Sequence, residues 1–162
     1  MAFDADGAWA ATGQVMPDLL ADLLAEPFFA LPPPKSTGRD LFHLDWLQPH
    51  LPPDSRPEDV QATLLMLTAQ SVADALRAHM PDARRLIACG GGARNGRLMQ
   101  ALTRLLPGVA VSSSEAHGLP VDQVEAAAFA WLAHRFVTRQ PGNLPAVTGA
   151  AGPRVLGALH PA

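Results

Sequence analysis

Hydrophobic positions recur at helical spacing in four segments of the chain. These segments are residues 16–26, 58–80, 95–106 and 121–139. Residues three and four apart lie on the same face of a helix, so each segment has an apolar stripe that a core could bury. Pro17 suits the first turn of the first helix, and Pro27 ends that helix. The pattern therefore predicts four helices.

Short apolar runs between these segments predict strands. They are residues 85–89, which we expect to be buried, residues 109–111, and residues 154–159 at the end of the chain. Prolines, glycines and polar residues interrupt the pattern elsewhere, and they predict loops over residues 48–57, 112–120 and 140–153. The order helix, strand, helix, strand, helix indicates an α/β fold built of layers.

Composition narrows the class of protein. The chain has 162 residues, of which 48% are hydrophobic and 17% charged, as expected for one globular domain. A net charge of −3 gives no basic surface for nucleic acid. Cys89 is the only cysteine, which fits a reducing compartment, and its place at the end of a strand predicts a small core residue. No apolar run approaches the length of a membrane span, and the first ten residues hold no Lys or Arg, unlike a signal peptide. We expect a cytoplasmic protein that binds neither nucleic acid nor membranes.

The strongest local motif is a strand that runs directly into three glycines and then a helix, in the sequence LIACGGGARNGRLM of residues 86–99. Glycines without Cβ atoms at the carboxyl end of a strand let a ligand lie against bare backbone N–H groups. The alternative is a glycine-rich turn that only packs strand on helix. Asn95 either caps the following helix or bonds a ribose hydroxyl. Neither a dinucleotide fingerprint nor a Walker loop occurs in the chain.

Glu125 lies on the apolar side of the helix predicted over residues 121–139, beside Val121, Ala128, Phe129 and Leu132. An inward-facing carboxylate needs a partner, because burying an unpaired charge is costly. We therefore expect Glu125 either to pair with a basic residue or to reach a ligand cleft.

Other polar clusters carry weaker signals. Lys35, Ser36 and Thr37 invite a phosphate-binding interpretation, but no glycine loop surrounds them, and a solvated loop lysine explains them equally well. The six histidines have no metal-ligand spacing. Residues 112–114 are three serines without a nucleophile motif, and Asp4 and Asp6 flank a glycine turn too short for a calcium loop. We interpret the histidines, the three serines and the two aspartates as structural.

Six segments together resemble the anhydro-N-acetylmuramic acid kinases, bacterial sugar kinases of the actin/hexokinase/Hsp70 superfamily. In chain order the segments are FDADGAWAATG, PPPKSTGRDLF, ATLLMLTAQSVADAL, CGGGARNGRLM, GLPVDQVEAAAFAWLA and PGNLPAVTGAAGPRVLG. The resemblance implies an actin-like ATPase (ribonuclease H-like) domain, an α/β layered mixed sheet with helices packed on it. It also implies an enzyme that cleaves 1,6-anhydro-N-acetylmuramic acid with water and phosphorylates it to N-acetylmuramic acid 6-phosphate in cell-wall recycling. ATP and Mg²⁺ are the implied cofactors.

The resemblance also suggests roles for individual residues. Gly90, Gly91, Gly92 and Asn95 match the segment that lies against the adenosine part of ATP. Glu125 matches an acidic residue that faces the sugar, and residues 35–37 match a loop near the cleft.

Residues 1–162 resemble the C-terminal, nucleotide-side domain of a two-domain kinase. The family's G-T-S-x-D-G-like phosphate loop and D-T-G-P-G-N-like segment with the catalytic base do not occur. We therefore expect a half that is inactive alone and that pairs with a missing N-terminal half or forms a homodimer. The alternatives are a non-catalytic nucleotide-binding or dimerisation module and an unrelated nucleotide-binding α/β domain.

Overall fold

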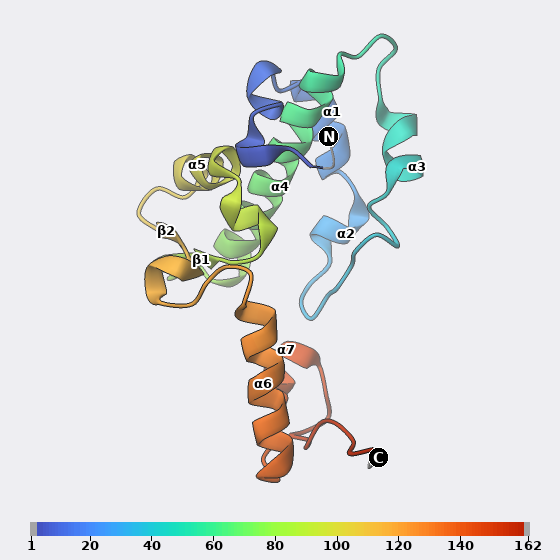
Figure 1. Ribbon diagram of the computed structural model, residues 1–162. Coiled ribbons are helices and arrows are strands. Elements are labelled where there is room, and N and C mark those ends of the chain that lie inside the picture. The colour runs from blue at the N-terminus through green and yellow to red at the C-terminus, as the bar shows by residue number, and fades with distance from the viewer. Residues whose placement is uncertain (1–2, 161–162) are drawn as a thin grey trace.

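The computed structural model describes residues 3–160. Its longest helix, α4 (Pro57–His79), runs through the body that the other elements before α6 form around it (Figure 1). Pro57 occupies the first turn together with two acidic residues, which favour a helix amino terminus. The helix predicted over residues 58–80 is confirmed. Its apolar stripe is only partly buried, because Leu67 is buried but Val72 is 38% exposed. The buried positions of α4 are Ala62, Thr63, Leu67, Ala69 and Ala73.

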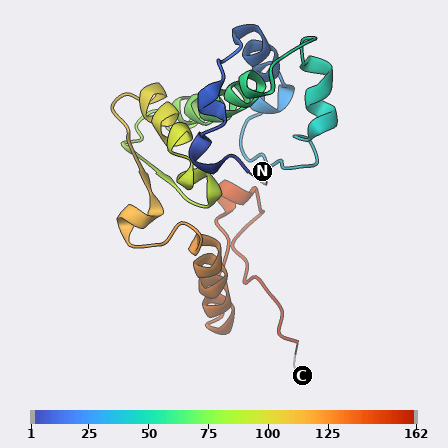
Figure 2. The ribbon, with the colours of Figure 1, turned by 45° about the horizontal axis from the view of Figure 1, so that its top comes forward.

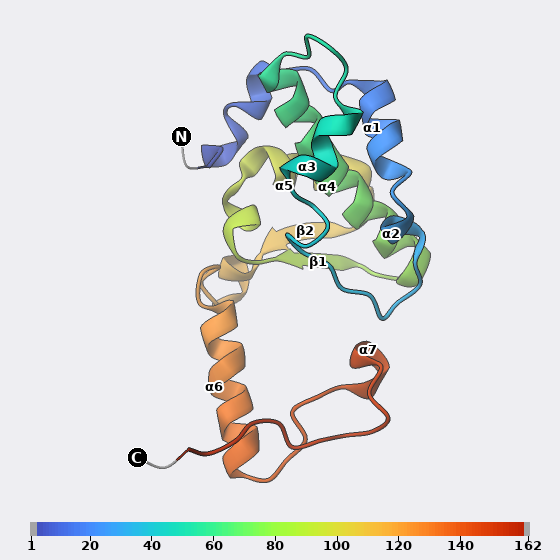
Figure 3. The ribbon, with the colours of Figure 1, turned by 90° about the vertical axis from the view of Figure 1, so that its right-hand side faces the viewer.

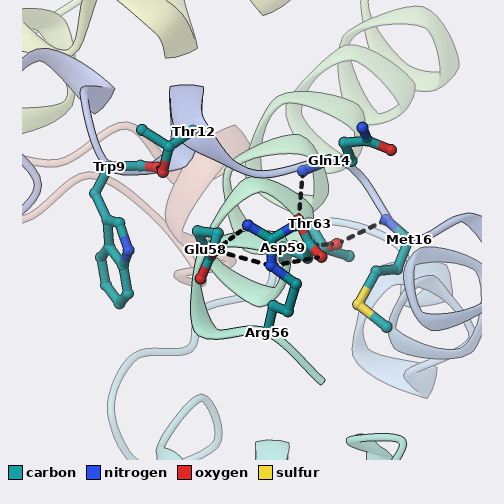
Figure 4. Close-up of polar contacts among 8 residues, drawn as sticks. All are labelled: Trp9, Thr12, Gln14, Met16, Arg56, Glu58, Asp59 and Thr63. Carbon is teal, nitrogen blue, oxygen red and sulfur yellow. Dashed lines mark hydrogen bonds and ion pairs between the residues drawn. The ribbon is translucent and has the colours of Figure 1, made fainter. Parts of the chain in front are cut away.

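Helix α1 (Pro17–Leu24) packs against α4, with Leu19 and Leu23 against Leu67. The approach to α1 is fixed by polar contacts with the first turns of α4, drawn in Figure 4. The hydroxyl of the fully buried Thr63 donates to the Asp59 carbonyl at 2.7 Å and accepts from the Met16 N–H at 3.0 Å. Before α1 the chain forms two short 3-10 turns, η1 (Ala5–Gly7) and η2 (Ala10–Thr12).

The proline-rich segment after α1 contains three short helical pieces. They are α2 (Pro27–Ala30), α3 (Leu44–Leu47) and η3 (Gln48–His50). Aromatic side chains hold this segment together, because Phe42 stacks on Phe29 and meets Trp46 edge to face. The loop predicted over residues 48–57 is correct except for η3 at its start.

Two parallel strands, β1 (Arg85–Ala88) and β2 (Ala110–Ser113), form the sheet, with Ala88 opposite Ser113. Helix α5 (Gly96–Leu105) connects them and packs with α4 on one face, where Ala69, Ala101 and Leu102 form a core. The helix predicted over 95–106 and the first two strands are confirmed, although the second strand runs two residues further than predicted. The chain is therefore α/β, but the described sheet is purely parallel rather than mixed.

Two predictions about burial near β1 are wrong. Ile87 of β1 is 48% exposed, and Cys89 is exposed rather than a core residue. Both errors have one cause. Because α4 and α5 cover one face of the sheet only, Ile87 on the other face, and Cys89 two residues further along just after the strand, have no layer packed on them in the described part of the chain.

Helix α6 (Val124–Val137) extends away from this body (Figures 1 and 3). The short α7 (Pro145–Thr148) turns back toward it (Figure 2), and a Cβ at Gly149, just after α7, would meet the Pro34 side chain at 3.0 Å. The helix predicted over residues 121–139 is confirmed with shorter bounds, and α7 forms within the loop predicted over residues 140–153. The strand predicted over residues 154–159 is wrong. Those residues return alongside the segment after α6 instead, where Gly142 N–H donates to the Arg154 carbonyl at 2.9 Å and Arg154 N–H donates to Asn143 Oδ1 at 2.6 Å.

Candidate nucleotide site

The glycine turn follows β1 directly and has a backbone that only glycine adopts readily. Gly90 has φ +69° and ψ −165°, a combination that is strained for residues with a Cβ. Its N–H donates to the Val121 carbonyl at 2.9 Å, which ties the turn to the loop before α6. The next four residues form the 3-10 turn η4 (Gly91–Arg94), which leads into α5.

The outer side of this turn is open. A Cβ atom at Gly90 or Gly91 would meet no other heavy atom within 4 Å, and one at Gly92 would meet only the Leu98 side chain at 3.6 Å. Among residues 3–160, no protein acceptor is found for the N–H groups of Gly91 and Gly92. Two of the three glycines therefore offer bare donors, as the sequence predicted, whereas the N–H of Gly90 is used within the fold.

A hollow of about 520 Å³ adjoins the turn. Gly91, Gly92, Arg94 and Asn95 form one wall. The opposite wall consists of Phe3, Asp4 and Asp6 from the amino-terminal segment, with Gln61 from α4. The volume lies in the range of small-ligand pockets.

Polar side chains already occupy the amino terminus of α5. Asn95 Oδ1 accepts from the Leu98 N–H at 3.0 Å, so Asn95 caps the helix, one of its two predicted roles. Asp6 Oδ1 accepts from the Gly96 N–H at 2.7 Å. A helix amino terminus attracts phosphate through its free N–H groups. Here two of these groups are satisfied by the protein itself.

The charges around the hollow also disfavour an anion. Arg94 forms an ion pair with Asp122, which raises the pKa of Arg94 through hydrogen bonding and leaves its charge largely compensated. Partial burial raises the pKa of Asp4, but hydrogen bonds from the N–H groups of Ala10 and Trp9 outweigh this and leave it below its usual value. Asp4 is therefore ionised at neutral pH. The hollow suits an uncharged polar group, such as a ribose and base, better than a phosphate.

Glu125 does not lie where the sequence placed it. Its side chain is exposed on α6, and it is not among the residues that line the hollow at the glycine turn. The predicted burial is wrong because, in the described residues, the chain packs only on the last turns of α6 and not on the first turns that carry Glu125, and no residue of α6 is fully buried. Its predicted approach to the sugar stays a prediction.

Lys35 lines a different hollow, of about 480 Å³, between α2 and α4. Its ammonium donates to the carbonyls of Phe28 at 3.0 Å and Phe29 at 2.8 Å, and lies 4.9 Å from the centre of the Phe28 ring. The lysine thus binds the end of a helix within its own chain. Ser36 is exposed and Thr37 half-buried, and neither lines the hollow at the glycine turn.

Sequence reasoning missed Asp4, Asp6 and Gln61 as residues of this hollow. From the sequence we interpret Asp4 and Asp6 as structural, and the carboxylates of both do accept hydrogen bonds from backbone N–H groups. They also form part of a wall of the hollow. The repeated aspartates of the DADG segment were the available signal. Within residues 3–160, no three His, Cys, Asp or Glu side chains are grouped so that they could hold a metal ion.

Comparison with known proteins decides the family. A model of the family described as "Anhydro-N-acetylmuramic acid kinase" matches residues 1–162. The chain belongs to the anhydro-N-acetylmuramic acid kinase family. Curated proteins of that name are similar over almost all of the chain. The one from Cupriavidus pinatubonensis is 59% identical over 165 residues, covering 99% of this chain and 44% of the relative. The one from Nitrosomonas europaea is 52% identical over 162 residues, covering 100% of this chain and 45% of the relative.

The resemblance seen in the six sequence segments is therefore confirmed. The chain spans less than half the length of the curated anhydro-N-acetylmuramic acid kinases that it matches. None of the helices within residues 3–160 combines the length and apolar character needed to cross a membrane.

Proposed function

We propose that the chain is the nucleotide-side, C-terminal domain of an anhydro-N-acetylmuramic acid kinase and binds the adenosine part of ATP on its glycine turn. The whole enzyme would cleave 1,6-anhydro-N-acetylmuramic acid with water and phosphorylate it to N-acetylmuramic acid 6-phosphate in the cytoplasm. The observation that carries the proposal is the open turn at Gly91 and Gly92, with two bare N–H donors beside a hollow of suitable size.

The residues present fit a nucleoside better than a triphosphate. The carboxylates of Asp4 and Asp6 can accept hydrogen bonds from ribose hydroxyls, and the glycines leave room for the flat base. Phosphoryl transfer depends on positioning the γ-phosphate with its Mg²⁺. We propose that the groups for that step, including the catalytic base, belong to the part of the family's length not covered here. The chain alone should then bind ATP or ADP weakly and show no kinase turnover.

A Gly91→Val substitution tests the site. The new side chain has space within the protein, because a Cβ there meets nothing within 4 Å, so it should obstruct only the ligand. We expect calorimetric titration with ADP to show at least a tenfold loss of affinity. Gly38→Val is the control, since Gly38 is also exposed and its Cβ would contact only the Asp40 side chain at 3.4 Å. Equal ADP affinity in the Gly91 variant and the parent chain would refute the proposed site.

A dimerisation module is the second candidate, and the exposed apolar side of α6 favours it. Measuring the mass of the chain in solution, with and without ADP, separates the two functions. A dimer that binds no nucleotide would support the second.

A further inference from the structure

Helix α6 is apolar on nearly every side, and yet none of its residues is fully buried. Its only polar residues are Glu125, His134 and Arg135. Phe129 is 64% exposed and Trp131 is 51% exposed. A helix that is hydrophobic all round normally lies inside a protein, so this helix lacks a layer that its sequence requires.

The chain itself covers only the end of this surface. A Cβ at Gly142 would touch the Leu132 side chain at 3.0 Å, and one at Gly157 would touch the Phe136 ring at 3.4 Å. The segment after α6 therefore packs on the last turns of the helix and leaves Phe129 and Trp131 bare. This segment adds further exposed apolar side chains, Leu144 and Val147.

The sheet has a bare face on the same side of the molecule. Figures 1 and 3 show α4 and α5 on one side of the strands and α6 with α7 on the other. Leu86 of β1 packs on the core that α4 and α5 form, so the next residue, Ile87, points to the opposite face, and it is 48% exposed. Parallel sheets are found almost only with both faces covered, and two strands are too few for an independently stable sheet. We call α6, α7 and the Ile87 face of β1 the apolar arm surface.

We infer that the apolar arm surface is a docking surface for polypeptide from the part of the family's length that this chain does not cover. The relatives are more than twice as long as the matched region, which is 44% of the Cupriavidus pinatubonensis protein. The remaining polypeptide needs a surface on which to pack. A broad, exposed surface rich in aromatic residues and poor in charge is typical of a protein contact.

The shape of the surface favours a protein over a small ligand. None of the hollows described above is lined by residues of α6, and a convex helix cannot enclose a small molecule. This inference goes beyond the nucleotide site and does not depend on it, because the glycine turn and the apolar arm surface share no residue.

The test uses the part of the Cupriavidus pinatubonensis relative that lies outside its 165-residue match, co-expressed with this chain. We expect a 1:1 complex by native mass spectrometry. Phe129→Asp and Trp131→Asp should each weaken it at least thirtyfold, because each places a charge in an apolar contact. Leu44→Asp is the matched control, since Leu44 is 63% exposed but lies on α3. It should change the affinity less than threefold.

Hydrogen exchange supplies a second measurement that does not depend on the variants. In the complex, the amides of α6 should exchange at least tenfold more slowly than in the chain alone. A complex that leaves α6 exchange unchanged, or that tolerates Phe129→Asp as well as Leu44→Asp, would overturn the inference. So would a folded chain that forms only homodimers through α6, or that binds nothing. Gly91→Val should form the complex normally, which separates this result from the fate of the nucleotide site.

Discussion

Two adjacent glycines, Gly90 and Gly91, should respond oppositely to the same small substitution. Neither would clash on gaining a methyl group, because a Cβ at either position meets no heavy atom within 4 Å. The difference lies in the backbone. Gly90 has φ +69° and ψ −165°, where a residue with a Cβ is strained by about 1–3 kcal/mol. Gly90→Ala should destabilise the fold by about that amount.

Gly91 does not have the positive φ of its neighbour. Replacing such a glycine by alanine leaves the folded chain unstrained and lowers the entropy of the unfolded chain, which stabilises a protein by about 0.4–1 kcal/mol. Gly91→Ala should therefore be neutral or slightly stabilising. The two variants should differ by roughly 1.5–4 kcal/mol, the combined range of these two effects.

Urea denaturation followed by circular dichroism measures this difference. With a slope of about 2 kcal/mol per molar urea, the midpoints of the two variants should lie about 0.7–2 M apart. Both variants should retain the slope of the parent chain, which shows that the same surface unfolds. Equal loss of stability in both variants would refute the reasoning, because it would mean that the turn is packed rather than open.

Two further predictions concern polar side chains that bind the backbone of the amino-terminal segment. Thr63→Val keeps the shape of the side chain but leaves the Met16 N–H without its acceptor, which should cost about 1–3 kcal/mol of unfolding free energy in urea, whereas Thr63→Ser should lose less. Asp4 has a lowered pKa in the folded chain, so its contribution to stability is present above the unfolded pKa of about 3.9 and is lost as the pH falls through the folded value. As the pH is lowered from 6 to 3, the free energy of unfolding should fall less steeply in Asp4→Asn than in the parent chain. An identical dependence on pH in the two proteins would contradict this.

The sequence predicted those features that depend on neighbours in the chain. Helical spacing located α1, α4, α5 and α6, and the apolar run before the glycines located β1. The open turn at Gly91 also followed from local sequence, because glycine's lack of a Cβ is a property of the residue itself.

Features that depend on distant partners were missed. Asp6 contacts the amino terminus of α5, 90 positions further along the sequence, and no local pattern predicts that contact. The prediction that Glu125 faces inward was wrong for a related reason. An apolar stripe shows that a helix needs a partner, but it does not say whether that partner lies within the described chain.

The bond from Asp6 to the Gly96 amide also bears on the order in which the molecule assembles. If this contact formed before any other long-range contact, it would close a loop of 90 residues, at an entropic cost of about 4 kcal/mol from the length alone. Helices and the β1–α5–β2 unit can form before that cost is met. The hollow at the glycine turn should thus be completed late in folding, and a nucleotide bound there, as we propose, would stabilise the chain after this last step.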